Sequence, residues 1–257
     1  AKTHDYILFV TSKGQMHWLK TYEIPEGTRD GRGRALVNLL ELEPDEQVRA
    51  MITIDEVDDP SRYIVMATRN GIVKKTRLDA YKHLRRKGIR AIVLDEDDDL
   101  IDAKITDGQQ QILLSSDAGM ACRFREQDVR EMGRTARGVR GMELRNPDGS
   151  LGAHIVSMTI VNPAAELLVI TARGMGKRSR LGHGIADQDQ EISGGGYRLT
   201  RRGSKGVTSI RLKPGDCVVQ PLQLEQNEDL IIPSLKGLVV RINTADIRTL
   251  GRSSQGV

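Results

Sequence analysis

The sequence predicts an all-β fold built from repeated four-stranded units, arranged as a propeller-like ring of about five to six blades. Short runs of β-forming residues recur along the chain, and each run closes on a polar turn that ends in glycine. A second glycine follows each turn, and basic residues gather near both glycines. The chain is 38% hydrophobic and 29% charged, which is typical of a globular protein. We find no apolar run of the roughly 18 residues that a membrane span needs.

The first strand of each unit is the apolar run that ends at a turn glycine. The five runs read YILFVTSKG, YIVMATRNG, QILLSSDAG, LLVITARG and LIIPSLKG. Their glycines are Gly14, Gly71, Gly119, Gly174 and Gly237. Because glycine reaches positive φ without steric cost, each run predicts a strand that enters a hairpin.

The second strand follows the glycine and carries cations. The five segments read QMHWLK, IVKKTR, MACRFR, MGKRSR and LVVRIN. The fourth residue past the glycine is Trp18, Lys75, Arg123, Arg178 or Arg241, and the sixth is Lys20, Arg77, Arg125, Arg180 or Asn243. Since positions two apart share one face of a strand, we expect a basic pair to project from one side in three repeats.

A second glycine marks a basic turn in every unit. These glycines are Gly33, Gly88, Gly138, Gly206 and Gly256. The segments around them read TRDGRGR, LRRKGIR, GRTARGVRG, TRRGSKGVTSIR and GRSSQGV. In the fourth unit about 13 extra residues separate the two glycines, and they lie within the polar loop GHGIADQDQEISGGGYRL.

Two further strands complete each full unit. Third strands such as ALVNLLEL and VTSIRL follow the basic turns. Acidic or polar turns (EPDEQ, DEDDD, NPDGS and KPGDC) then lead to fourth strands such as VRAMITI and VVQPLQL. We expect one domain over residues 1–257, with repeats near 1–57, 58–108, 109–162 and 163–226 and an incomplete repeat at 227–257. Radial repetition protects the strand edges.

Three other kinds of site are disfavoured. A Walker loop needs GxxxxGK followed by Ser or Thr between a strand and a helix, whereas TRRGSKGV has another order and no predicted helix. The run DEDDD falls where each full repeat has an acidic or polar turn, which favours a solvated turn over a metal site. The five histidines share no spacing, and Cys122 and Cys217 are two idle thiols, as in a reducing cytosol. The sequence therefore offers no catalytic constellation, metal site or cofactor site.

The basic turns and basic strand faces favour a polyanion as the partner. Aromatic residues are only 3% of the chain, so single strands would find few side chains on which to stack. Five basic turns on one rim predict a track for a duplex backbone, bound through counterion release. The candidate DNA-binding residues are Lys20, Arg32, Arg34, Lys74, Lys75, Arg77, Arg85, Arg86, Lys87, Arg123, Arg125, Arg134, Arg137, Arg140, Lys177, Arg178, Arg180, Arg201, Arg202, Lys205, Arg241 and Arg252. The alternatives are a protein-interaction propeller that binds a peptide in a central funnel, and an enzyme.

The chain resembles the C-terminal domain of the DNA gyrase A protein. The resemblance covers essentially the whole chain and is carried by THDYILFVTSKGQMHWLKTYEIPEGTRDGRGRALVNLLELE, ATRNGIVKKTRLDAY and RTARGVRGMEL. It implies a β-pinwheel, whose blades exchange strands with their neighbours. It also implies a non-catalytic module that wraps duplex DNA around a basic rim with positive handedness.

The resemblance further implies partners and a location. The wrapped DNA would be presented to the N-terminal cleavage core of the gyrase A protein, in an A2B2 complex with the gyrase B protein that introduces negative supercoils. ATP and Mg²⁺ would bind elsewhere in that complex, leaving no cofactor in this domain. The isolated domain is expected to be a monomer, and the complex is expected in the bacterial cytoplasm at the nucleoid, not at a membrane.

The family's gyrase-A box has the sequence Gln-Arg-Arg-Gly-Gly-Lys-Gly and lies in its first blade. A box-like turn in the fourth repeat here consists of Thr200, Arg201, Arg202, Gly203, Ser204, Lys205 and Gly206. We expect the family's own box to lie before Ala1, which is not a methionine and suggests a fragment. The related C-terminal domain of the topoisomerase IV A protein, which serves decatenation, is the alternative within the same superfamily; PEGTRDGRGRALVNLLELE favours gyrase.

Overall fold

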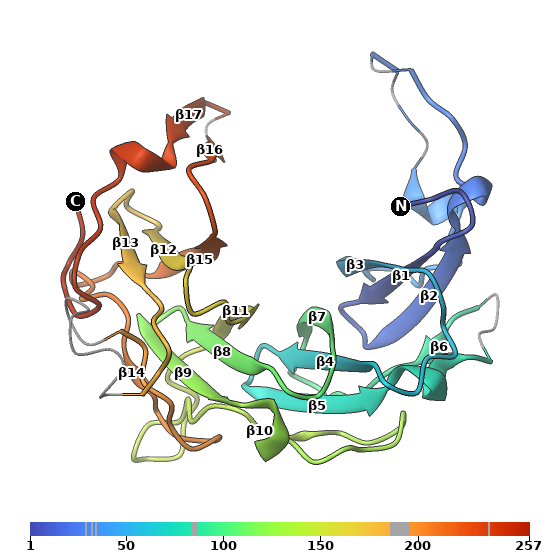
Figure 1. Cartoon of the computed structure of the whole chain (residues 1–257), viewed down its shortest axis with the longest axis horizontal. Coiled ribbons are helices and arrows are strands. Elements are labelled where there is room, and N and C mark those ends of the chain that lie inside the picture. Colours follow the sequence, from blue (N-terminus) through green and yellow to red (C-terminus); the bar gives the residue numbers. More distant parts are fainter. Residues whose placement is uncertain (29, 32, 34, 84–86, 186–195, 236) are drawn as a thin grey trace. The chain divides into compact units, whose positions relative to one another are not determined.

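The computed structural model describes residues 1–28, 30–31, 33, 35–83, 87–185, 196–235 and 237–257. The chain forms two compact units (Figure 1). Unit 1 comprises Ala1–Gln110 and Glu126–Gly141, and unit 2 comprises Gln111–Arg125 and Met142–Val257. The described residues form β-strands and short 3-10 helices, which confirms the all-β prediction. In this part of the chain, no helix has the length and apolar character to cross a membrane.

Unit 1 contains two four-stranded antiparallel sheets. The first has the order β3 (Val48–Ile54), β1 (Tyr6–Thr11), β2 (Gln15–Lys20) and β6 (Ile89–Arg90). The second has the order β10 (Val139–Arg140), β5 (Ile72–Arg77), β4 (Tyr63–Thr68) and β7 (Leu100–Thr106). Its 3-10 helices are η1 (Thr21–Glu23), η2 (Leu36–Asn38), η3 (Leu78–Tyr81) and η4 (Glu126–Asp128).

Unit 2 contains three sheets. A four-stranded sheet has the order β11 (Ile155–Ile160), β8 (Gln111–Ser116), β9 (Met120–Arg125) and β14 (Val207–Thr208). A three-stranded sheet has the order β13 (Gly176–Arg180), β12 (Glu166–Thr171) and β15 (Val218–Leu224). The last sheet pairs β16 (Asp229–Pro233) with β17 (Val239–Asn243), and η6 (Thr244–Asp246) follows it.

Each four-stranded sheet receives its short edge strand from the next sequence repeat. β6, β10 and β14 follow the second glycine of repeats 2, 3 and 4, yet they pair with β2, β5 and β9 of the preceding repeat. This exchange confirms the predicted β-pinwheel blade. The expected third strands are wrong in extent: ALVNLLEL contains η2, and in VTSIRL only Val207 and Thr208 form a strand. The single domain over residues 1–257 stays a prediction.

The apolar strands of each unit pack into its own core. In unit 1, Leu8, Met16, Ile64 and Met66 are completely buried. In unit 2 the core includes Leu167, which is also completely buried. Burial of one such side chain contributes about 1.5–3 kcal/mol. The fourth strands β3 and β7 lie against each other in unit 1, and so do β11 and β15 in unit 2, so the edge with the exchanged strand faces away from these contacts.

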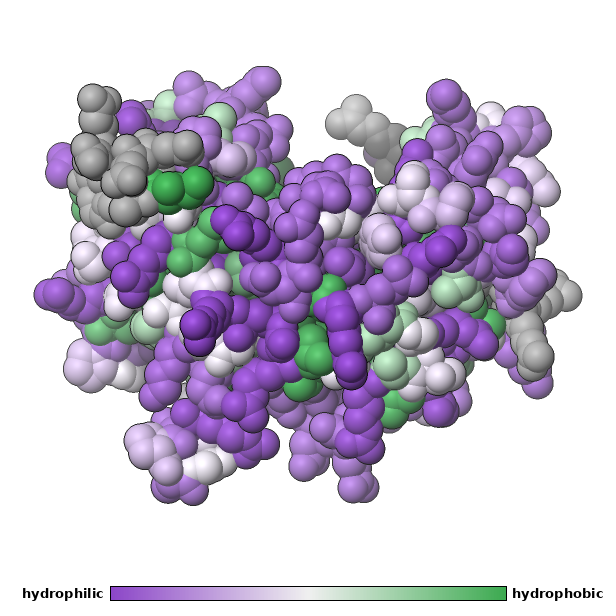
Figure 2. Space-filling view, turned by 60° about the horizontal axis from the view of Figure 1, so that its bottom comes forward, coloured by the Kyte–Doolittle hydropathy of each residue, from purple (hydrophilic) through white to green (hydrophobic). Residues whose placement is uncertain are grey.

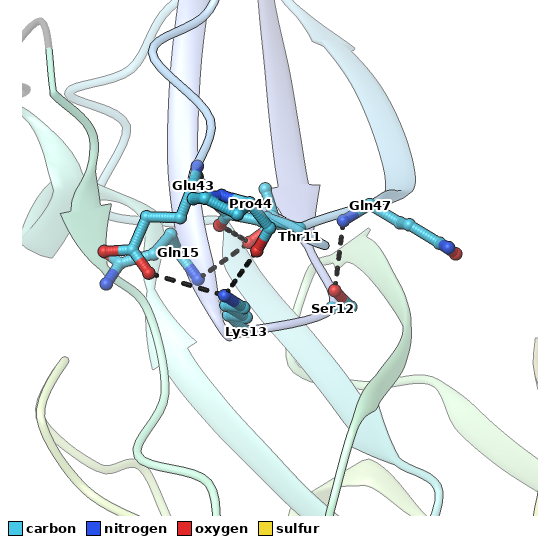
Figure 3. A network of polar contacts seen from close by, with 8 residues as sticks. Thr11, Ser12, Lys13, Gln15, Glu43, Pro44 and Gln47 are labelled. Atoms are coloured by element: carbon cyan, nitrogen blue, oxygen red, sulfur yellow. Dashed lines mark hydrogen bonds and ion pairs between the residues drawn. The ribbon is translucent and has the colours of Figure 1, made fainter. Parts of the chain in front are cut away.

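The acidic turns hold the first hairpin of their repeat. In Figure 3, Lys13 donates to the Pro44 carbonyl at 2.8 Å and pairs with Glu43, beside the β1–β2 turn. The Thr11 hydroxyl donates to buried Glu46 and accepts from the Gln15 amide at 3.2 Å. The second repeat has the same arrangement, with Thr68 accepting from the Ile72 amide at 3.2 Å.

The run 95–99 is such a turn. Asp98 is 8% exposed and accepts from the Asn70 amide at 2.8 Å. Burial raises the pKa of Asp98. Within the described residues, no group of three or more His, Cys, Asp or Glu side chains is placed to hold a metal ion. The run therefore forms a turn, but Asp98 is not solvated as predicted: it is buried and has a structural role at the hairpin.

Gly206, the last residue of the box-like turn, has no room for a side chain. This residue offers a test of how the exchanged strand packs. Gly206 has a φ of +73°, and a Cβ there would lie 2.1 Å from the Ala121 carbonyl oxygen on β9. We expect Gly206→Ala to lower the free energy of unfolding by about 3 kcal/mol. Gly174→Ala is the matched control, because its φ is +79° but its Cβ would meet nothing; it should cost about 1 kcal/mol. Urea unfolding measures both, and equal losses would contradict the packing argument.

Candidate nucleic-acid interface

Three of the basic turns are each attached to the preceding sheet by both of their limbs. The incoming limb makes a parallel bridge to the fourth residue past the first glycine: Lys75 with Glu131, Arg123 with Leu199, and Arg178 with Thr249. The outgoing limb then runs antiparallel along the same strand, through β10 on β5 and β14 on β9. Beside β13, Val257 takes the place of this antiparallel strand, and its amide donates to the Gly176 carbonyl at 3.0 Å. The chain therefore reverses over the edge of the strand.

The reversal has the same hydrogen bonds in each copy. The amides of Ala136, Ser204 and Ser254 donate to the carbonyls of Gly133, Arg201 and Gly251, at 3.1, 3.2 and 3.0 Å. We call residues 133–138, 200–206 and 251–256 the basic turns from here on. All three lie at the edge opposite the fourth strand of their sheet, which supports the prediction that the basic turns are equivalent within their units.

The residue beneath each basic turn is buried and bonded to it. This is the third residue past the first glycine: Lys74 on β5, Cys122 on β9 and Lys177 on β13. The Lys177 ammonium donates to the Gly251 carbonyl at 2.8 Å and the Arg252 carbonyl at 2.5 Å. These side chains therefore hold the main chain of the turn from inside.

Burial changes the protonation of the two lysines. Both side chains are completely inaccessible to solvent. Desolvation, with a smaller contribution from the charge of Arg252, lowers the pKa of Lys177 to about 8. Desolvation and the charge of Arg134 lower the pKa of Lys74 to about 8 as well. At neutral pH both remain cations, but they are charges inside the protein.

Arg123 is also internal, and it ties together the two flanks of the fourth-repeat insertion. Its Nη1 donates to the carbonyls of Leu181, Gly182 and Tyr197, at 3.0, 2.9 and 2.9 Å. Its Nε donates to Gln111 at 2.7 Å. The Tyr197 amide also donates to the Leu181 carbonyl at 3.1 Å. The base of the insertion is thereby closed, while residues 186–195 lie outside the described part.

The predicted cations divide into groups that sequence did not separate. Four are buried, so the prediction of an exposed basic surface is wrong for Lys74, Lys75, Arg123 and Lys177. Both faces of β5 and β9 are covered around these residues, and Lys75 donates to the Glu126 carbonyl at 3.2 Å. Half-buried positions are Lys20, Arg77, Arg134, Arg178, Arg202 and Arg252. Arg32, Arg34, Arg85 and Arg86 lie outside the described residues.

Several half-buried cations also have partners within the fold. Lys20 lies 3.2 Å from the centroid of the Tyr6 ring. Arg178 pairs with Glu166 at 3.2 Å and donates to the Ile247 carbonyl at 2.8 Å. Arg252 donates to the Gly196 and Thr208 carbonyls, at 2.9 and 2.6 Å. These three residues stabilise turns and strand ends in addition to any contact with a ligand.

The remaining predicted cations are exposed. They are Lys87, Arg125, Arg137, Arg140, Arg180, Arg201, Lys205 and Arg241. Arg137 pairs with Asp95 at 2.7 Å, and Arg241 pairs with Asp229. Among described residues, Arg125, Arg180, Arg201 and Lys205 have neither an ion pair nor a side-chain hydrogen bond, so phosphates would find them available. Two of these four, Arg201 and Lys205, belong to the box-like turn.

Sequence reasoning missed several exposed cations at the same edge. Arg130, Arg198 and Arg248 directly precede the bridging residues of the incoming limbs, and Arg90 lies on an exchanged strand. Arg90 lies on β6, two residues past Gly88, and is exposed. Arg140 has the same offset from Gly138 on β10. The offset from the second glycine, applied to every repeat, is the signal that would have found Arg90.

The face in Figure 2 is mainly polar. Hydrophobic residues appear there in small groups between polar ones. Such a face suits a charged partner better than a broad apolar interface. This description applies to the one face that Figure 2 shows and to its coloured atoms.

Blades that exchange a strand and present cations at the exchanged edge define a propeller-like β-pinwheel with a basic edge. The family described as the DNA gyrase C-terminal domain, beta-propeller, matches residues 5–55, 62–107, 110–162, 165–183, 192–224 and 228–257. The chain belongs to this family.

Curated relatives are DNA gyrase A proteins. The chain is 38% identical to that of Haloquadratum walsbyi over 265 aligned residues, which covers 100% of this chain and 29% of the relative. It is 37% identical to that of Staphylococcus aureus, covering 99% of this chain and 27% of the relative. The chain thus spans less than a third of the length of these relatives.

Two solved structures share the fold. The C-terminal domain of DNA topoisomerase IV has a TM-score of 0.85 and 28% identity, covering 99% of this chain and 74% of that chain. The DNA gyrase A C-terminal domain has a TM-score of 0.76 and 22% identity, covering 100% and 78%. The second likeness concerns the fold alone.

The buried and exposed members of one basic pair should behave differently. Arg123→Ala removes one donor from each of three carbonyls and from Gln111, and of these the Leu181 carbonyl keeps another donor, the Tyr197 amide. We therefore expect it to lower the free energy of unfolding by about 3 kcal/mol. Arg125→Ala removes an exposed side chain and should change it by less than about 0.5 kcal/mol. Urea unfolding of both variants measures the contrast, and similar losses would refute the division into internal and surface cations.

Proposed function

We propose that this chain is a non-catalytic module that binds, bends and wraps duplex DNA with positive handedness. The observation that carries the proposal is the set of exposed cations on and beside the basic turns, above all Arg201 and Lys205. The family supports the choice of DNA, since its relatives are components of DNA gyrase.

The chemistry is electrostatic and independent of sequence. Arginine and lysine side chains neutralise phosphates and release counterions from the duplex. Main-chain amides beside glycines add donors at close range. Bending a site of 20–30 base pairs by 40–90° costs on the order of 1–6 kcal/mol, and contacts spread over several repeats offset this cost.

Within a whole enzyme, the module presents the wrapped duplex to the strand-passage core. The partners in this proposal are the cleavage core of the gyrase A protein and the gyrase B protein, in an A2B2 assembly that introduces negative supercoils with ATP. ATP and Mg²⁺ bind elsewhere, so the module has no cofactor of its own. The isolated module is monomeric, and the assembly acts at the bacterial nucleoid in the cytoplasm.

A decatenating role, as in topoisomerase IV, is the second candidate. It is favoured by the TM-score of 0.85 to the C-terminal domain of DNA topoisomerase IV. The higher identity to DNA gyrase A proteins, 38% against 28%, favours the gyrase role.

Duplex affinity should fall steeply with salt, and the slope should depend on the exposed cations. Each phosphate contact contributes roughly 0.9 to the slope of log K against log salt. We expect the combined variant Arg125→Ala, Arg180→Ala, Arg201→Ala, Lys205→Ala to flatten the slope by about that amount for each contact removed. Fluorescence anisotropy with a labelled duplex at several salt concentrations measures it.

The matched control removes cations from the opposite sheet edge. Arg49 lies on β3 and Lys104 on β7, and both are exposed. The variant Arg49→Ala, Lys104→Ala should keep the slope of the unmodified protein. Because the control removes two cations and the test variant four, a control slope that falls by half as much as that of the test variant would mean that total charge, and not the basic turns, determines binding.

Wrapping predicts a change in DNA topology. Relaxed circular DNA is incubated with the protein and sealed by a nicking-closing enzyme, and its linking number is measured. We expect a positive shift that grows with protein concentration, because a right-handed wrap constrains positive writhe. The absence of a shift at saturating protein would reject wrapping.

A further inference from the structure

The lysines beneath two of the basic turns have a geometry that packing alone does not require. Lys74 lies between the strand residues that bond the two limbs of its turn, Val73 with Val139 on one side and Lys75 with Glu131 on the other. Since both neighbours are fixed to opposite limbs, the turn has to cross over the Lys74 side chain. Lys177 lies in the same way between Gly176 and Arg178.

The ammonium groups donate mainly to main-chain carbonyls. Lys177 Nζ donates to Gly251 and Arg252 of the turn and to the Ser179 hydroxyl, the last at 3.1 Å. Lys74 Nζ donates to the Ala91 carbonyl at 2.6 Å and to the Arg134 carbonyl of its turn. An ammonium has three donors, so Lys177 uses all of them. The carbonyls it binds point into the protein.

The groups that face these ammoniums are neutral or positive. Arg252 and the phenol of Tyr197 lie near Lys177, and burial raises the pKa of Tyr197 to about 12. Arg134 and the phenol of Tyr81 lie near Lys74, and the Tyr81 hydroxyl shares the Ala91 carbonyl at 3.2 Å. Burial raises the pKa of Tyr81 too. Among described residues, no carboxylate pairs with either lysine, so each adds uncompensated positive charge to its turn.

The third turn shows what the position needs for folding alone. There Cys122 Sγ lies 3.4 Å from the hydroxyls of Thr200 and Ser204 and 3.8 Å from the Arg201 carbonyl. The turn still closes through the Ser204 amide. A neutral group of modest hydrogen-bonding strength therefore suffices for the reversal, and the charge at Lys74 and Lys177 is additional.

We propose that Lys74 and Lys177 are positioning residues for duplex binding, each holding the main chain of its basic turn and adding a buried positive charge behind it. This inference rests on the proposed function, because it assigns the turns to phosphate binding. Arg134 and Arg252 are the turn residues whose carbonyls the lysines hold, so each lysine fixes the main chain from which one of these side chains extends.

A pH dependence follows from the buried charge. Both lysines have a pKa of about 8 in the free protein, below the ordinary value of about 10.4. Phosphates at the turn favour the charged form, so binding takes up protons near pH 8 to 9. Affinity is therefore complete well below pH 8, where both lysines are charged, and declines as pH rises through 8.

The test compares two double variants with the unmodified chain. Lys74→Met, Lys177→Met removes the donors and the charge, whereas Lys74→Gln, Lys177→Gln keeps donors without charge. Duplex affinity is measured from pH 7.0 to 9.5 at constant salt, and thermal melting checks folding. We expect affinity of the unmodified chain to fall by about twofold to tenfold over this range. The affinity of the Gln variant should be nearly constant from pH 7.0 to 9.5. The Met variant should bind more weakly than the unmodified chain at every pH.

The control is Lys104→Met, which removes an exposed lysine on β7 and should keep the pH profile. A second measurement needs no variant: carbon-13 NMR of the lysine side chains should show the pKa of Lys177 rising when duplex is added. Identical affinity and pH profile in all variants, or an unchanged pKa, would overturn the inference. Failure of the unmodified chain to bind duplex at pH 7 would instead reject the proposed function.

Discussion

The attachment of each basic turn by both limbs to one strand is the constraint on which the rest of the structure depends. The parallel bridge and the antiparallel strand flank a single residue, so the turn must pass over it. Close passage requires a residue without Cβ at Gly206, whose φ is +73°. It also buries the side chain beneath, which must then satisfy carbonyls that have lost water. The path of the turn therefore determines both where glycine is required and which residue can be buried beneath it.

The same residue type serves two purposes in this fold. Arg123 donates to three carbonyls at the base of the insertion, while Arg125, two positions further on, is exposed. A basic strand here is therefore a mixture of internal hydrogen-bond donors and surface charge. The high content of lysine and arginine includes both internal donors and exposed cations. Only the exposed cations can contact a phosphate directly.

The sequence predicted the strands that are decided locally. Alternation and turn glycines located β2, β3, β5, β9 and β15 with the same bounds as the structure. The third strands were overextended because their pairing depends on a strand in the preceding repeat, and only the family resemblance implied that exchange. Pattern alone also could not separate Lys75 from Arg77, because period-2 alternation assigns a face but does not say whether the face is covered. Arg90 was overlooked although it lies in the basic segment LRRKGIR, at the same distance from Gly88 as Arg140 from Gly138.

Strand exchange also decides what can be copied or lost as a piece. The chain leaves unit 2 after Arg125 and returns to it at Met142, so residues 126–141 belong to the fold of the preceding blade. A genetic duplication or deletion cut at the repeat boundaries would join Lys74 to a foreign turn. A segment that keeps residues 72–141 together would carry β5, the basic turn that covers it and Lys74 as one piece. Blade number can therefore change during evolution most easily at junctions displaced from the repeat boundary by about half a repeat.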